Sequence, residues 1–227
     1  MNHFRDLLLI LLVAMVALSS CRKEEEIIPS SRVRVGVPGR PGKIKGFFLL
    51  NEANMGSNKA TLDYYDYTTA FYTRNIYAKR NPNVVKELGD VGNDLQIHGS
   101  RLYAVINVSG LIEVMDVRTA KHIGKLSIPN CRYIAFKDGF AYVSSYAGPV
   151  KIDPNARLGY VAKVDTATLK VVAECPVGYQ PEELLIQGDK LYVANSGGYR
   201  APNYDKTISI IDLKTFTEEK QVDVAIN

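Results

Sequence analysis

The side chains that most often carry catalysis are scarce in this chain of 227 residues, which has three histidines. The two histidines beyond the N-terminal segment, His98 and His122, lack the spacing of a metal-binding pair. The sequence contains no Gly-x-Ser-x-Gly turn and no glycine loop of the kind that holds phosphates. Asp153 and Asp205 could offer oxygen ligands to Ca²⁺, but neither lies in a loop dense in such ligands. We therefore predict no catalytic residue, no metal and no cofactor, and a protein that is not an enzyme.

Recognition chemistry is better represented, in three segments where Tyr, Arg and Asn lie among Gly and Pro. These segments are residues 51–58, 145–158 and 195–205. A rigid aromatic ring and a forked guanidinium can contact a ligand at low conformational cost. For any single position the alternative is that the residue only holds a long loop in shape. The candidate ligand-binding residues in the three segments are Asn51, Glu52, Tyr146, Arg157, Asn195, Tyr199, Arg200 and Tyr204.

A fourfold repeat indicates how the chain positions these segments. Asp-x-x-Thr begins at Asp66, Asp116, Asp165 and Asp212, so successive copies are 50, 49 and 47 residues apart. Before each of the last three copies, two apolar stretches are joined by a short turn, and one further stretch lies on each side of the Asp. An Asp carboxylate can accept hydrogen bonds from the backbone two residues on, which suits a tight turn. Each unit is therefore predicted to be a four-stranded antiparallel sheet.

Four-stranded repeats of about 40 to 50 residues are typical of β-propeller blades. We predict an all-β propeller domain over residues 46–227, with about four blades and almost no helix. Lys and Arg occur mostly as single residues and the net charge is only +4, so nucleic acid is not an expected partner. Cys131 and Cys175 would lie in the innermost and outermost strands of one blade, about 14 Å apart, too far for a disulfide. Two separate buried thiols are expected.

The repeat varies mainly in the connection between its second and third strands. From the Tyr of a unit to the following Asp there are 13, 23 and 20 residues, and a further surplus lies near residues 74–83. In a propeller these connections surround the mouth of the central channel, and insertions on one face usually mark the binding face. Asn93, Arg132 and Glu182 occupy equivalent positions in the crossovers to that face but differ in charge and size. We predict that they join the binding surface, although ion pairing between blades would also explain them.

The first 45 residues are predicted to export and anchor the protein. Residues 1–20 contain Arg5, an apolar run and Leu-Ser-Ser before Cys21, which fits a signal peptide ending in a bacterial lipobox. Cys21 would then be the lipidated first residue, and its acyl chains would hold the protein on a membrane without spanning it. The acidic cluster at 24–26 resembles the surface-export signal of Bacteroidetes lipoproteins, and the alternative is an ordinary solvated charge run. Within residues 21–45, the part after position 26 is expected to be a flexible stalk.

Two sets of residues carry a resemblance to known propellers. Leu-Tyr-Val-Ala-Asn at 191–195 and Ile-Ser-Ile-Ile-Asp at 208–212 resemble the YncE-like, or YVTN-type, propellers. Residues 46–57, with Leu-Asp-Tyr-Tyr-Asp at 62–66, are similar to a narrower group of surface lipoproteins from gut Bacteroidetes that includes the cobalamin-capturing BtuG proteins. The resemblance covers residues 46–227 and implies a seven-bladed ring. The chain is either a fragment of such a ring or relies on partners, and the fragment is the favoured interpretation because an open arc leaves strand edges exposed.

The resemblance also implies a function. It suggests a lipid-anchored protein on the outer face of the outer membrane that binds a corrinoid such as cobalamin and passes it to a TonB-dependent transporter. The alternative is a propeller that docks on an outer-membrane assembly without a small ligand, and a lactonase-like enzyme is a weaker third possibility. If the variable loops form the site, Tyr146, Arg157, Tyr199, Arg200 and Tyr204 should carry most of the binding energy. The Asp turns lie on the far face and should affect stability alone.

Overall fold

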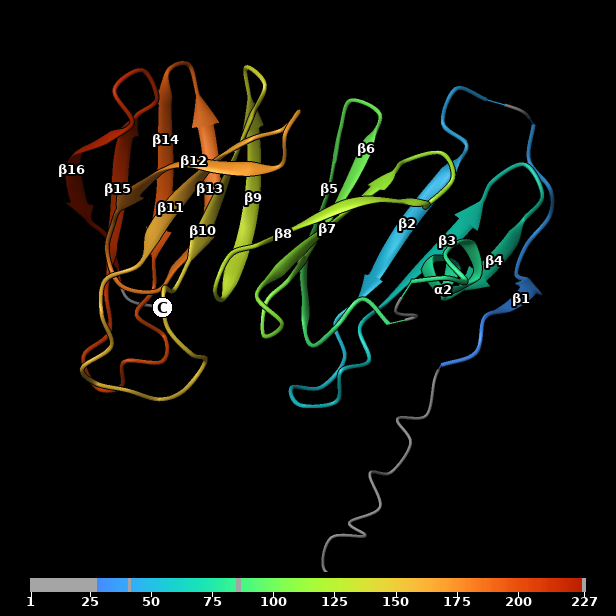
Figure 1. The fold of residues 1–227 in the computed structure, drawn as a ribbon, viewed down its shortest axis with the longest axis horizontal. Helices are drawn as coiled ribbons and strands as arrows, with labels where there is room; N and C mark the ends of the chain where they lie inside the picture. The colour runs from blue at the N-terminus through green and yellow to red at the C-terminus, as the bar shows by residue number, and fades with distance from the viewer. Residues whose placement is uncertain (1–27, 41, 85–86, 226–227) are drawn as a thin grey trace, which may run out of the picture.

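The computed structural model describes residues 28–40, 42–84 and 87–225, which form four four-stranded antiparallel sheets arranged in an arc (Figure 1). The predicted signal peptide, Cys21 and the acidic cluster lie outside the described residues. The predicted class, an all-β propeller with four-stranded blades, is confirmed. The strands of the first sheet are β1 (Ser31–Arg34), β2 (Gly46–Asn51), β3 (Thr61–Asp66) and β4 (Phe71–Arg74).

The other three blades follow chain order from the innermost strand outward. The second blade contains β5 (Gly92–His98), β6 (Arg101–Ile106), β7 (Leu111–Asp116) and β8 (His122–Ser127). The third blade contains β9 (Cys131–Lys137), β10 (Phe140–Ser145), β11 (Tyr160–Asp165) and β12 (Lys170–Pro176). The fourth blade contains β13 (Pro181–Gln187), β14 (Lys190–Asn195), β15 (Thr207–Asp212) and β16 (Thr217–Asp223).

The Asp-x-x-Thr turns connect the third and fourth strands of the blades, as predicted. The Asp Oδ1 accepts a hydrogen bond from the Thr backbone N–H at 3.1, 2.9, 2.7 and 3.1 Å in the four successive copies. The residue after each Thr has a left-handed backbone, for example φ 55° at Ala120. Its N–H donates to the carbonyl oxygen of the Asp, at 2.8 Å for Ala120. None of these four left-handed residues is glycine, so the hydrogen bonds within the turn must outweigh the backbone strain.

The core lies between neighbouring blades, where the apolar faces of adjacent sheets pack together. Between the second and third blades, for instance, Val105 and Ile112 pack in one cluster with Ile134 and Val143. Burying one such side chain contributes about 1.5–3 kcal/mol. Cys131 and Cys175 belong to two different clusters and are both free, as predicted. Burial raises the pKa of the Cys131 thiol to about 12, so it is unreactive at neutral pH.

The prediction of a flexible stalk is wrong for the central part of that segment. Ser31–Arg34 form β1, which pairs antiparallel with β4 and becomes the outer edge of the first sheet. The guanidinium groups of Arg32 and Arg34 lie 3.7 and 4.8 Å from the centre of the Phe71 ring. Such cation–π contacts help to hold a segment whose composition, read alone, suggested a flexible chain.

The surplus predicted near residues 74–83 contains the helix α2 (Ile76–Arg80), five residues long. The Asn75 side chain caps it by accepting a hydrogen bond from the Ala78 N–H at 3.3 Å. Ile76 and Tyr77 are buried in the cluster between the first two blades. This short helix is the exception to the predicted absence of helix in the described part of residues 46–227.

Candidate functional site

Three loops lie at one end of the blades, opposite the Asp turns, at the lower end in Figure 1. They are the β2–β3, β10–β11 and β14–β15 connections, residues 52–60, 146–159 and 196–206, here called the mouth loops. Two of them are hydrogen-bonded to each other. The Asp153 N–H donates to the Tyr199 carbonyl at 2.8 Å, and Asn203 Nδ2 donates to the Pro154 carbonyl at 3.3 Å. Two of the three loops predicted to form one surface are thus in contact.

Two hollows adjoin on this face. The larger, about 560 Å³, is lined by residues of the first, second and third blades and of the crossover between the last two, which include Met55, Asn107 and Asn130. The smaller, about 390 Å³, is lined by residues that include Lys151 and Arg157. Both hollows are bordered by Gly148 and Pro149, so one short stretch of backbone separates them. The arrangement can accept one extended ligand across both hollows or two small ones.

A charged cluster beneath the smaller hollow connects two blades. Arg132 Nε donates to Glu182 Oε2 at 2.9 Å, and both side chains are only 18% exposed. The Tyr146 hydroxyl donates to the other oxygen of Glu182, and the Arg132 guanidinium lies 5.0 Å from the centre of the Tyr146 ring. Tyr146 is 4% exposed, and its burial, followed by the negative charge of Glu182, raises the pKa of its hydroxyl. Ion pairing between blades, the structural alternative for the crossover positions, is therefore present.

The third crossover residue takes part in the same pattern. Asn93 Nδ2 donates to the Arg132 carbonyl at 2.6 Å and so connects the second blade to the third. Asp94, beside it, accepts a hydrogen bond from the Ile134 N–H at 3.0 Å. Asn93, Arg132 and Glu182 thus form a chain of contacts across the inner strands of the second, third and fourth blades, and two of the mouth loops belong to the last two of these blades.

The predicted residues of the β14–β15 loop are held in different ways. The Tyr199 ring lies 6.3 Å from that of Tyr146, centre to centre, and the Tyr199 N–H donates to Gln180 Oε1 at 2.5 Å. The Arg200 guanidinium lies 3.5 Å from the centre of the Tyr179 ring, and its Nη1 donates to the Asn203 carbonyl at 2.8 Å. The side chain of Tyr204 is exposed. Tyr204 is therefore available to a ligand as it stands, whereas Arg200 would have to leave a stacked position.

The remaining predicted residues divide into loop supports and exposed groups. Asn195 is buried, and its Nδ2 donates to Thr207 at 2.9 Å and Ser209 at 2.8 Å. Asn51, at the equivalent place in the first blade, donates to Thr61 Oγ1 at 3.0 Å. Both Asn residues therefore hold the start of a loop. Glu52 and Arg157 are exposed, and neither forms an ion pair with a described residue.

Sequence reasoning missed the residues that precede the inner strands. Asn130 has φ 46° and donates from Nδ2 to the Gly148 carbonyl at 2.8 Å, while Gln180 has φ 50° and lines the smaller hollow. Val91, at the same place before β5, also has a positive φ of 62°. Lys151, which pairs with Asp153 at 3.3 Å, was missed as well. An alignment of the crossovers residue by residue would have identified Asn130 and Gln180, because each of them, like Val91, directly precedes the inner strand of its blade.

The described residues offer neither a metal-binding cluster nor a membrane-spanning helix. Among them, no group of three or more His, Cys, Asp or Glu side chains is placed to hold a metal ion. No helix within the described part is long and apolar enough to cross a membrane.

Comparison with known proteins identifies a protein family that this chain matches. The profile of the family described as "Domain of unknown function (DUF5074)" matches residues 45–175. A comparison with curated proteins finds no match.

Solved structures resemble the chain in fold. Hydrazine synthase from Kuenenia stuttgartiensis matches with a TM-score of 0.58 and 14% identity, covering 81% of this chain and 47% of that one. Apo AztD from Citrobacter koseri matches with a TM-score of 0.51 and 15% identity, covering 82% of this chain and 46% of that one. The computationally designed Ika8 protein matches with a TM-score of 0.53 and 13% identity, covering 82% and 48%. The chain thus spans about half the length of these structures, and at such identities the likeness concerns the propeller fold alone.

Proposed function

The chain belongs to the DUF5074 family, and from this premise we propose that it captures a large polar ligand of the corrinoid class, such as cobalamin, on its mouth loops. The observation that carries the proposal is the pair of adjoining hollows of about 560 and 390 Å³ on the face where the repeat varies most. A corrinoid is a flat ring with amide side chains and a phosphate, so it needs a broad site rather than a deep one. Two shallow hollows on either side of a backbone ridge suit that shape.

The chemistry of the lining also suits such a ligand. Asn107 and Asn130 border the larger hollow and could exchange hydrogen bonds with amide groups, although both already serve loop contacts. Lys151 and Arg157, both exposed, border the smaller hollow and offer positive charge to a phosphate. Tyr204 on the neighbouring loop offers an aromatic face.

The buried cluster beneath the site supports tight binding indirectly. The Glu182 carboxylate accepts hydrogen bonds from both Arg132 and Tyr146, and these bonds keep the β10–β11 loop in one conformation. A loop that is ordered before the ligand arrives loses little entropy on binding. We infer that these three residues position the site, and that Arg157, Lys151 and Tyr204 contact the ligand.

The cellular setting belongs to the same proposal. A lipid on Cys21 would hold the protein on the outer membrane facing outward, and a TonB-dependent transporter would receive the ligand. Both follow from the signal sequence and the resemblance to the cobalamin-capturing lipoproteins.

Isothermal titration with cobalamin tests the ligand, using a Cys21→Ser version of the chain so that it stays soluble. We expect saturable binding, which Arg157→Ala weakens about thirtyfold, equivalent to about 2 kcal/mol. Arg118→Ala is the matched control, since Arg118 is exposed on the opposite face, and it should bind as the unchanged protein does. Absence of heat, with no colour retained after gel filtration, would exclude a corrinoid.

One observation favours the second candidate, a protein-docking module without a small ligand. The mouth loops expose three large apolar side chains, with Ile152 74%, Leu158 48% and Met55 54% exposed. Exposed apolar groups gathered on one face are typical of protein interfaces. Under this alternative, Ile152→Lys abolishes co-purification of the chain with outer-membrane proteins, and titration with cobalamin gives no binding heat.

A further inference from the structure

The segment that leads from β1 into β2 concentrates positive charge. Residues 32–45, here called the strap, contain five basic residues, and the sequence has no Asp or Glu from position 28 to position 45. The described residues of the strap are all exposed. None of its basic side chains forms a salt bridge with a described carboxylate. The five are Arg32, Arg34, Arg40, Lys43 and Lys45.

Aliphatic side chains are interspersed with these charges. Val33, Val35 and Val37 are 46, 57 and 87% exposed, and Ile44 is 75% exposed. Single exposed aliphatic residues are common on protein surfaces, but four of them among five cations form a mixed surface. Such a mixture suits the interface of a membrane, where cations meet phosphates and aliphatic groups reach the boundary of the acyl chains.

Hydrogen bonds hold the strap against the first Asp turn. The Val35 N–H donates to the Ala70 carbonyl at 3.0 Å, and the Gly39 N–H donates to the Tyr67 carbonyl at 2.9 Å. The Tyr67 N–H in turn donates to the Lys45 carbonyl at 2.9 Å. The strap therefore lies at the Asp-turn end of the first blade, opposite the mouth loops, where Figure 1 shows the chain turning at the upper right before β2.

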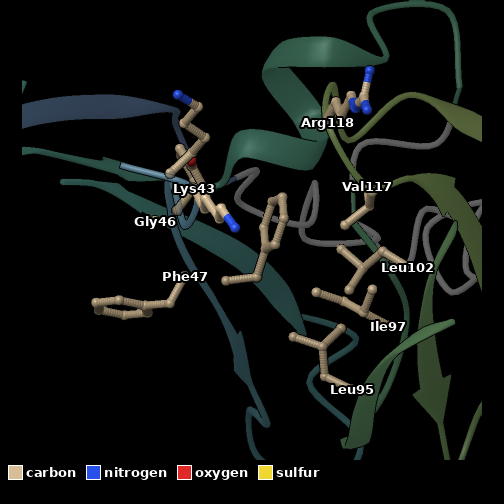
Figure 2. A pocket seen from close by; sticks show the side chains of 11 residues that line it. Lys43, Gly46, Phe47, Leu95, Ile97, Leu102, Val117 and Arg118 are labelled. Carbon is tan, nitrogen blue, oxygen red and sulfur yellow. The ribbon is translucent and has the colours of Figure 1, made fainter. Parts of the chain in front are cut away.

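The second blade extends this positive surface. Arg118, in the second Asp turn, is exposed and lines a cavity of about 790 Å³ together with Lys43 and Lys45. Figure 2 shows Lys43 and Arg118 on either side of the upper part of this cavity. Asp66 and Asp116, the carboxylates of the two turns, each accept hydrogen bonds from N–H groups of their own turn. Positive charge is therefore in excess at this end of the first two blades.

A lipid on Cys21 would bring the first blade close to a membrane without orienting it. Ile28 is fixed to the blade, because its carbonyl accepts a hydrogen bond from Asn75 Nδ2 at 2.9 Å. The seven residues from Cys21 to Ile28 span at most about 25 Å, whereas the six-residue strand β2 is about 20 Å long. The tether can thus reach either end of the blade. Residues 22–27 contain two basic and three acidic residues, a net charge of −1, which does not offset the strap.

We propose that the strap, together with Arg118, docks on the phosphate-bearing headgroups of the membrane that holds the lipid anchor. The cationic groups contact phosphates, and the exposed Val and Ile side chains enter the interface. The Asp-turn face of the first two blades then lies against the membrane, and the mouth loops face away from it. This inference rests on the proposed anchor at Cys21, and it gives the proposed corrinoid site access to the medium.

Vesicle binding by a form without lipid isolates the strap. The protein is the chain from position 21 onward with Cys21→Ser, since the apolar run of residues 1–20 would bind any vesicle; it keeps every described residue. We expect it to sediment with vesicles that contain phosphatidylglycerol and not with phosphatidylcholine alone, and added salt should weaken the binding. The triple variant Arg40→Gln, Lys43→Gln and Lys45→Gln should bind about a hundredfold more weakly, because each basic side chain at an anionic surface contributes about fivefold.

A second triple variant controls for net charge. Lys125→Gln, Lys206→Gln and Lys220→Gln remove the same charge from exposed sites away from the Asp turns and should leave vesicle binding unchanged. Titration of the strap variant with cobalamin should match that of the unchanged protein, so the vesicle result and the corrinoid result can fail separately. Equal weakening by the two triple variants, or no binding of the unchanged chain to phosphatidylglycerol vesicles, would overturn the proposal.

Fluorescent labels test the orientation. Val37→Cys places a label on the strap and Tyr204→Cys places one on a mouth loop, while Cys131 and Cys175 are buried and should stay unlabelled. On phosphatidylglycerol vesicles that contain a lipid-borne quencher, we expect the label at position 37 to be quenched and the label at position 204 to stay bright. Stronger quenching at position 204 than at position 37 would show that the opposite face meets the membrane, contrary to the proposal.

Discussion

Replacing Glu182 by Ala tests whether the interblade cluster holds the third and fourth blades together. The carboxylate accepts hydrogen bonds from Arg132 Nε at 2.9 Å, from the Tyr146 hydroxyl, and from Ser196 Oγ at 3.3 Å. Its loss leaves the Arg132 guanidinium without a counter-ion and the Tyr146 hydroxyl without an acceptor, whereas Ser196 Oγ still donates to the Gln180 carbonyl at 3.1 Å.

The magnitude follows from burial. Removing one member of a fully buried ion pair destabilises a protein by about 3–5 kcal/mol, and a hydrogen bond to a charged group contributes about 1.5–3 kcal/mol. Arg132 and Glu182 are 18% exposed, so water can solvate the remaining guanidinium in part. We therefore expect Glu182→Ala to lower the free energy of unfolding by about 3 kcal/mol. Glu182→Gln keeps the acceptor for Tyr146 and should cost about 1–2 kcal/mol.

Urea denaturation at pH 7 measures both variants. Glu174→Ala is the matched control, because Glu174 is exposed on β12 and forms no ion pair with a described residue, so its effect should stay within about 0.5 kcal/mol. A double-mutant cycle with Arg132→Met should give a coupling energy of about 1–2 kcal/mol. Strict additivity in the cycle, or a cost for Glu182→Ala no greater than for Glu174→Ala, would refute the role assigned to the cluster.

Three further predictions concern the turns, the core and the site. The pKa values of Asp189 and Asp212 are lowered to about 2 by hydrogen bonds from Lys137 and Lys190, respectively, so the stability they contribute is present above pH about 4 and is lost as pH falls toward 2. Asp189→Asn should flatten the fall of the melting temperature between pH 5 and 2, and an unchanged slope would contradict this assignment. Leu191→Ala opens a cavity between the last two blades, where Leu191 is fully buried, and should cost about 2–5 kcal/mol in urea denaturation. Asp212→Ala should lower the melting temperature by several degrees and leave the affinity for cobalamin unchanged. If the folded variant bound cobalamin more weakly, the assignment of the site to the mouth-loop face would be wrong.

The fold could be predicted from the sequence because its signals are local or periodic. Each Asp-x-x-Thr turn is made by hydrogen bonds within five consecutive residues, for example from the Thr168 N–H to Asp165 Oδ1 at 2.7 Å. Alternating apolar residues and short turns identify strands in the same local way. The nearly constant spacing then implies equal sheets packed side by side. The separation of Cys131 from Cys175 followed from strand spacing alone.

Contacts between segments far apart in the chain were decided by the tertiary structure. Ser31–Arg34 have no strand-like pattern of their own, and they become a strand because β4 offers an unpaired edge about 40 residues later. The sequence predicted that Tyr146 contacts a ligand, but in the structure Tyr146 is buried and its hydroxyl donates a hydrogen bond to Glu182. The edge position of β2, which pairs with β3 alone among the described strands, is likewise a property of the tertiary structure. Local hydrogen bonding and periodicity specify a blade, whereas the exposure of a side chain depends on which other blade or loop lies against it.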